Sequence, residues 1–293
     1  MSEIEPVLPS KPLRHLPPNA CDSHAHVFGP FDRFPLAPER SYTPPFAPVD
    51  AYWRMLRHMG FARAVVVQAS AYGTDNRCTE DAVVSSSPNM RGIGVVAPDV
   101  SEDDLARLAA HGFRGMRFTE IVSKRYAGRI KGAVGFAELL ELGSRLKQHG
   151  MHAQIFAVLD DFIAAAPALL ELGIPLVLDH MARLGPGERK VNDPAFQTLL
   201  GLLREGRVWV KLTAFRNSER LPNYEDVRPF HTALLQANPD RLIWGSDWPL
   251  LNMGDKAPDI GHLIDLLFDW TQDDALIKRI FVENPAKLYG FDS

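Results

Sequence analysis

The sequence predicts an α/β fold, a single (β/α)8 barrel, and three observations support this prediction. The chain has 293 residues, the length of one such barrel with insertions. Short β-branched stretches alternate with helical patterns along the whole chain. Several of those stretches (VVV, LVL, LIW) are apolar at consecutive positions, as strands are when helices cover both faces of a sheet. No internal repeat or linker divides the chain, so we expect one domain over 1–293.

Eight strands are expected in order along the chain. Their ranges are 20–27, 62–68, 91–96, 113–119, 152–158, 175–181, 208–214 and 241–247. Helical patterns follow the strands and repeat apolar residues at helical spacing. Those with the clearest patterns are Ser101–His111, Val134–His149, Asp160–Leu172, Asp193–Leu203, Tyr224–Ala237 and Asp273–Leu288. An open doubly wound sheet is the alternative fold, but the Gly-rich turn that usually follows its first strand is replaced here by DSHAHVFGP.

Two segments lie outside this alternation. Residues 1–19 mix charges and prolines without an apolar core, so we expect an N-terminal extension and not a signal peptide. Residues 28–49 follow the first strand and contain six prolines and five aromatic residues. A long loop of this kind is usually functional or disordered. Its aromatic content favours an ordered, lid-like insertion over the site.

Composition excludes several classes of protein. The 32 Lys and Arg against 36 Asp and Glu give a net charge of −4, which argues against a nucleic-acid partner. Two cysteines, Cys21 and Cys78, exclude a disulfide scaffold and a cysteine-built metal site. No apolar run approaches the roughly 18 residues of a membrane span. We therefore expect a cytoplasmic protein without a membrane partner.

Polar residues occur where several of the expected strands end. His24 and His26 are two positions apart on the first strand, a spacing that points both side chains to one face. His180 follows the sixth strand, and Asp247 follows the eighth. Each residue alone has an ordinary structural explanation, such as a satisfied histidine or a helix cap. Because the active sites of such barrels form at the strand ends, their joint occurrence favours a functional site.

The chain resembles the amidohydrolase superfamily over nearly its whole length, and its lactonase branch most closely. The matching stretches are DSHAHVFGPFDRFP, GFARAVVVQASAYGTDN, GFRGMRF, VLDHM, IWGSDWP and NPAKLYGF. The resemblance implies a barrel enzyme that opens a lactone ring. The chain departs from the branch at Phe156, where the lactonase pattern has a tyrosine, so we expect a related substrate.

Many members of this superfamily hold a catalytic zinc ion. Here the fifth strand offers Gln154 and Phe156 towards the barrel mouth, and His152 is expected at its opposite end. Zinc would therefore need His24, His26, His180 and Asp247 as ligands, an unusual set. The lactonase branch that the chain resembles works without metal. We expect that no cofactor is required, with one Zn²⁺ as the alternative.

Ester hydrolysis without metal needs a general base and donors for the developing oxyanion. We expect Asp247 to be the base that takes a proton from water, its pKa raised by partial burial beside Trp248. His24, His26 and His180 would donate hydrogen bonds to the lactone carbonyl and protonate the leaving oxygen.

Arginines near the mouth predict an acidic substrate, because the guanidinium group binds carboxylates in a bidentate manner. By resemblance, Arg117, Arg125 and Arg216 would bind the acidic groups. The hydroxyl groups that would add hydrogen bonds belong to Tyr42, Ser70 and Thr74. The alternative is that the loop arginines are ordinary surface charges.

The predicted function is hydrolysis of a carboxylated lactone. The candidates are a pyrone dicarboxylate, a muconolactone or sulfomuconolactone, and an aldarolactone. A zinc-dependent decarboxylase of the same superfamily is one alternative. A catalytically silent barrel that binds acidic metabolites is the other.

Overall fold

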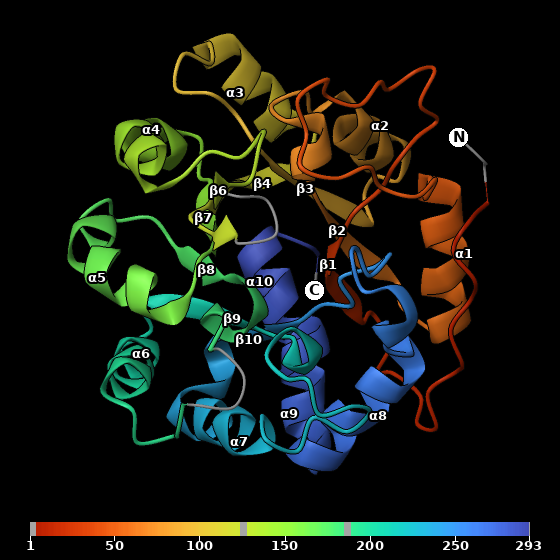
Figure 1. The fold of residues 1–293 in the computed structure, drawn as a ribbon, viewed down its shortest axis with the longest axis vertical. Coiled ribbons are helices and arrows are strands. Elements are labelled where there is room, and N and C mark those ends of the chain that lie inside the picture. The colour runs from red at the N-terminus through yellow and green to blue at the C-terminus, as the bar shows by residue number, and fades with distance from the viewer. Residues whose placement is uncertain (1–3, 124–127, 185–188, 293) are drawn as a thin grey trace.

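The computed structural model describes residues 4–123, 128–184 and 189–292. It confirms the predicted (β/α)8 barrel: eight parallel strands form a ring in chain order, with helices around it (Figure 1). The strands are β1 (Cys21–Ala25), β2 (Arg63–Val67), β3 (Met90–Gly94), β4 (Phe113–Thr119), β7 (His152–Phe156), β8 (Leu176–Leu178), β9 (Val208–Leu212) and β10 (Leu242–Trp244). Each lies within one residue of a predicted range or inside it.

The ring closes between β1 and the segment that follows β10. The backbone N–H of Asp247 donates to the carbonyl of His24 at 2.8 Å. The N–H of His26 donates to the carbonyl of Trp248, also at 2.8 Å, and Ala25 and Trp248 form a parallel bridge. The predicted active-site residues of the first and last strands therefore share one seam.

The helices largely match the predicted ranges, with two corrections. The helix expected over 224–237 starts only at Arg228, because Tyr224 has a positive φ of 50°. The helix expected over 273–288 is divided into α9, a π-helical turn at Arg279–Glu283 and α10, whose first turn contains Pro285. The helices are α1 (Val49–Met59), α2 (Arg77–Ser85), α3 (Glu102–Ala110), α4 (Phe136–Gln148), α5 (Leu159–Leu170), α6 (Pro194–Arg204), α7 (Arg228–Ala237), α8 (Ile260–Thr271), α9 (Asp274–Lys278) and α10 (Asn284–Tyr289).

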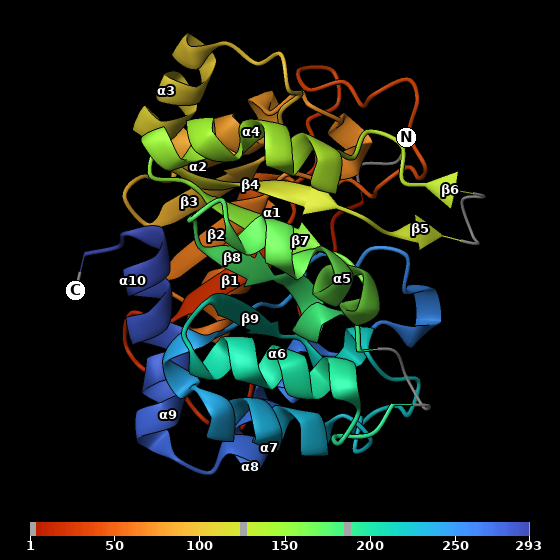
Figure 2. The same ribbon diagram turned by 90° about the vertical axis from the view of Figure 1, so that its left-hand side faces the viewer.

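The two ends of the barrel differ, as the side view shows (Figure 2). Helix α10 lies across the end where the strands begin, which we call the base. The hairpin of β5 (Val122–Ser123) and β6 (Gly128–Arg129) projects at the end where the strands finish, which we call the mouth. The interior near the base is mainly apolar, and His152 is a polar residue buried there. Its buried apolar residues are Cys21, Val65, Val67, Ile93, Val177, Trp209, Ile243, Tyr289 and Phe291.

Segments outside the barrel attach to it by specific contacts. In the N-terminal extension, Ser10 hydrogen-bonds to Asp259, and the backbone of Leu13 to Asp265 of α8. The insertion after β1 begins and ends in an antiparallel bridge between Phe28 and Ala47. None of the helices in the described residues is both long and apolar enough to cross a bilayer.

Candidate active site

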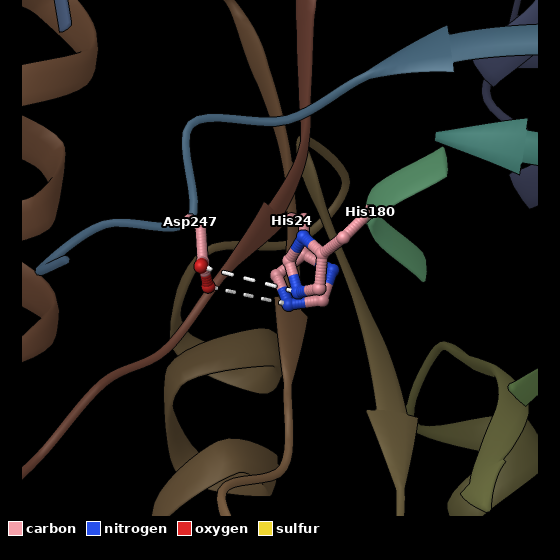
Figure 3. Close-up of side chains that lie close together, drawn as sticks. All are labelled: His24, His180 and Asp247. Carbon is pink, nitrogen blue, oxygen red and sulfur yellow. Dashed lines mark ion pairs between the residues drawn. The ribbon is translucent and has the colours of Figure 1, made fainter. Parts of the chain in front are cut away.

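The structure brings the four predicted catalytic side chains together at the mouth (Figure 3 shows three of them). Asp247 Oδ1 lies 3.6 Å from His24 Nε2 and 3.4 Å from His26 Nε2. Asp247 Oδ2 lies 3.9 Å from His180 Nε2. All four residues are buried, with 4% exposure or less. One carboxylate therefore faces three imidazole rings in a site of low solvent access.

An irregularity in β1 aims His24 into the barrel. Asp22 pairs with Ala64 of β2, and Ala25 pairs with Val66. The chain therefore advances three residues in β1 over a length where β2 advances only two, so β1 contains a bulge. Cys21 belongs to the apolar interior, and His24 also points inward to Lys211, although regular alternation would place them on opposite faces. Such bulges occur next to active sites, where they redirect a side chain.

His180 lies on a left-handed turn that follows β8. The turn spans Asp179–Ala182, and His180 has a φ of 51°. Asn217 stabilises this turn: its Nδ2 donates to the His180 carbonyl at 2.8 Å, and its Oδ1 accepts from the N–H of Leu184 at 2.8 Å. The sequence reasoning missed Asn217, and only the close approach of two loops reveals it.

A hydrogen-bond network fixes the seam behind Asp247. Asp22 Oδ2 accepts from the hydroxyl groups of Ser246 at 2.5 Å and Tyr52 at 3.0 Å, and its Oδ1 accepts from the Ser246 N–H at 2.8 Å. Burial raises the pKa of Asp22 to about 6, while these hydrogen bonds act in the opposite direction. The network connects β1, α1 and the loop that carries Asp247.

A second polar cluster lies inside the barrel beside His24. Asp179 Oδ1 is 3.2 Å from His24 Nδ1 and 3.4 Å from Lys211 Nζ, and its Oδ2 is 3.2 Å from Arg117 Nε. Gln154 accepts from Lys211 at 2.7 Å and donates to Asp179 at 3.2 Å. Asp179 and Lys211 are fully buried. Lys211 is thus the interior partner of a carboxylate.

The expected rise of the Asp247 pKa is wrong. Burial does raise it, but Arg216 and the surrounding histidines outweigh burial and hold the Asp247 pKa well below its usual value. Arg216 Nε donates to Asp247 Oδ2 at 2.6 Å. Trp248 stacks instead on Tyr52, with ring centroids 5.1 Å apart. Burial lowers the pKa of His24 to about 3 and that of His180 well below the usual histidine value, so both rings are neutral at pH 7.

A pocket opens at the mouth above this cluster. The predicted residues that line it are His26, Tyr42, Ser70, Arg117, His180, Arg216 and Asp247. Thr74 does not reach it: the turn at Ser70–Tyr72 carries the chain away, and Thr74 lines neighbouring surface hollows. Arg125 lies outside the described residues. His152 is at the base, its ring centroid 5.6 Å from that of Tyr289, as predicted.

Three of the four predicted zinc ligands form a compact donor group. One atom each from His24, His180 and Asp247 lies within 4.8 Å of the others, so the group could hold a metal ion. Within the described residues, His24 Nε2 has no hydrogen-bond partner and is available as a ligand. His26 lies outside this group, and its Nδ1 is 2.8 Å from the Val67 carbonyl. The donor set fits a cation, although Arg216 already occupies one oxygen of Asp247.

Comparison with known proteins places this chain in a family. The 2-pyrone-4,6-dicarboxylate hydrolase of Comamonas testosteroni is 37% identical, over 96% of this chain and 93% of that protein. The 4-sulfomuconolactone hydrolase of Hydrogenophaga intermedia is 36% identical, over 95% and 91%. A structure from Pseudomonas putida, of a proposed 2-pyrone-4,6-dicarboxylic acid hydrolase, superposes with a TM-score of 0.81 at 29% identity, over 95% and 100%. The amidohydrolase family model matches residues 21–291. The chain therefore belongs to the amidohydrolase family.

Proposed function

We propose that this protein is a lactonase that hydrolyses an anionic lactone. The observation that carries the proposal is the ionised Asp247 surrounded by His24, His26 and His180 at the floor of an arginine-lined pocket. The names of the two relatives, both hydrolases and one explicitly of a lactone, support this reaction class.

Asp247 acts as the general base for the attacking water. It takes one proton through Oδ1, because Arg216 engages Oδ2. Its low pKa makes it a weak base, but it also keeps the carboxylate ionised throughout the physiological pH range. A lactone with an acidic leaving oxygen, such as an enol, suits a weak base best, since its ring opens without strong activation of the water.

The histidines stabilise the oxyanion that forms on the lactone carbonyl. His24 and His180 are neutral, so each donates through one N–H without repelling the arginines. One well-placed donor is worth roughly 3–4 kcal/mol of barrier. When the ring C–O bond breaks, the proton held by Asp247 passes by way of a histidine of this cluster to the leaving oxygen, and the products are a carboxylic acid and an alcohol or enol.

Arg117 and Arg216 bind acidic groups of the substrate, assisted by the hydroxyl groups of Tyr42 and Ser70. The arginines line the pocket and are largely buried, which strengthens their attraction for an anion. Thr74 has no part in this arrangement.

A zinc-dependent reaction is the second candidate, supported by the donor group of His24, His180 and Asp247. These residues would hold the ion, and it would polarise the carbonyl and lower the pKa of a bound water. We favour hydrolysis without metal, because Arg216 pairs with Asp247 and Lys211 lies 3.1 Å from His24 Nδ1, where both add positive charge.

The first experiment is turnover of a panel of carboxylated lactones: a pyrone dicarboxylate, a muconolactone, its sulfonated analogue and an aldarolactone. Protein treated with a chelator is tested by proton release, with and without added zinc. Activity of the stripped protein supports the metal-free lactonase. Activity only with zinc supports the zinc form, and carbon dioxide release would support the decarboxylase. Ligand binding without any turnover would support a silent barrel.

A further inference from the structure

Arg183 differs from the other two described arginines of the mouth pocket. It lines the pocket directly after the left-handed turn of His180 and itself has a φ of 48°. Arg117 has a carboxylate partner in Asp179 at 3.2 Å, and Arg216 has one in Asp247 at 2.6 Å. Among the residues that the structure describes, no carboxylate pairs with Arg183.

The surroundings of Arg183 are unfavourable to a charge. Its guanidinium lies 5.9 Å from the centroid of the Phe156 ring, and Arg117 lies 5.0 Å from the same centroid. Burial lowers the Arg183 pKa and the positive charge of Arg216 lowers it further, whereas the charge of Asp247 acts in the opposite direction. A partly buried cation close to other cations costs free energy in the empty protein, and the cation–π contact with Phe156 acts in the opposite direction. An anion that enters the pocket would supply the direct partner that Arg183 lacks among the described residues.

We propose that Arg183 binds an acidic substituent of the substrate, away from the lactone carbonyl, and thereby makes the enzyme selective for anionic lactones. The inference rests on the proposed lactonase function. Arg117 and Arg216 must divide their hydrogen bonds between an internal carboxylate and the substrate. Arg183 can donate all of its guanidinium N–H groups to the substrate. Carboxylate and sulfonate groups share the required chemistry, with paired anionic oxygens that accept from a guanidinium.

Binding of a planar dianion tests the proposal without any turnover. Isophthalate and 3-sulfobenzoate are titrated calorimetrically into the wild type, Arg183→Met, Arg183→Lys and the control Arg220→Met, whose side chain is 73% exposed. We expect Arg183→Met to weaken binding about 10- to 100-fold, since hydrogen bonds to charged groups contribute that much. Arg183→Lys should lose less, and Arg220→Met should bind like the wild type. Comparison of the two probes shows whether the carboxylate or the sulfonate is preferred.

Thermal unfolding separates a binding role from a structural one. Arg183→Met should melt at the wild-type temperature or above, because it removes an unpaired charge and keeps an unbranched side chain. Arg117→Met should melt lower, because it leaves the buried Asp179 without one of its cations. A lower melting temperature for Arg183→Met would mean that this arginine is structural, and would overturn the proposal.

The kinetic arm compares an acidic lactone with its neutral methyl ester. Arg183→Met should raise KM for the acidic lactone about 10- to 100-fold, keep kcat within a few-fold and leave the ester unaffected. Binding of both probes by Arg183→Met within twofold of the wild type, or no binding by the wild type, would refute the proposal. If the wild type binds the dianions through Arg183 but opens no lactone, the lactonase function fails and the anion site stands.

Discussion

The two ends of the barrel differ in the types of residue that adopt the left-handed backbone conformation, in which φ is positive. At the base, most positions with positive φ are glycines, such as Gly60 at 93° after α1 and Gly150 at 65° after α4, and the exceptions are Asn19 and Gln272. At the mouth, glycines such as Gly29 also take this conformation, but so do several residues with side chains, among them His180 at 51°, Arg183 at 48° and Asp247 at 57°. A side chain in this region costs about 1–2 kcal/mol, a cost that glycine avoids.

The difference shows which end is built for stability and which for chemistry. The base has turns that are mostly relaxed by glycine and a mainly apolar interior covered by α10. The mouth has strained turns, and each of its strained residues named above lines the pocket. Strain of this kind persists where the surrounding structure enforces it and the side chain is needed in place. Each prediction below breaks or sharpens this contrast.

The largest effect is expected for Asp247→Asn at the mouth. Asparagine tolerates positive φ and has nearly the same shape, so the substitution removes the base with little change of backbone. We expect kcat to fall about 10²- to 10⁴-fold while isophthalate still binds. Turnover and calorimetry measure the two. Retained turnover with lost binding would contradict the role of Asp247 as the base.

Arg117→Met tests whether the mouth also contributes to stability. Asp179 is fully buried, and loss of Arg117 removes one of the cations that hold its pKa well below the usual value. Breaking a buried ion pair typically costs about 3–5 kcal/mol. We expect a decrease of this order in the free energy of unfolding, together with a higher KM. Unchanged unfolding in urea would show that Lys211 alone compensates the charge of Asp179.

Asp22 in the seam should make stability depend on pH in the opposite direction to the mouth carboxylates. Its pKa is raised to about 6 by burial, whereas the pKa values of Asp179 and Asp247 are lowered. The folded protein binds the Asp22 proton more tightly than the unfolded chain does. The contribution of Asp22 to the free energy of unfolding therefore decreases by about 3 kcal/mol as the pH rises from 4 to 6.

The variant Asp22→Asn removes this titration. Urea unfolding at several pH values should show that the difference in stability between the variant and the wild type changes over pH 4–6. A constant difference would mean that Asp22 does not titrate there. Asp179 and Asp247 act in the other direction, because their stabilisation is lost as the pH falls below about 4.

The smallest effects test the backbone contrast itself. Gly150→Ala at the base places a methyl group where no atom lies within 4 Å, so only backbone strain changes, and we expect a loss of about 1 kcal/mol. Ala182→Gly at the mouth, where φ is 56°, should relieve a similar strain. Its net gain is smaller, because glycine adds entropy to the unfolded chain. Thermal unfolding of both variants should shift in opposite directions, and a shared direction would refute the contrast.

The sequence determined most of the fold and the identity of the central residues. Consecutive apolar residues located the eight strands, because a strand covered on both faces leaves a local pattern. Strand ends located His24, His26, His180 and Asp247, because parallel strands direct their ends to one side. These inferences depend on local spacing and on chain order alone.

Only the tertiary structure decided the electrostatics of the site and the hydrogen-bond and ion-pair partners of its residues. The bulge in β1, the pairing of Arg216 with Asp247 and the turn held by Asn217 each depend on segments far apart in the chain. The pKa of Asp247 was predicted in the wrong direction because a sequence gives burial but not the neighbouring charge. Arg183 went unnoticed for the same reason. Whether a charge is paired depends on distances in space, which no local pattern of residues encodes.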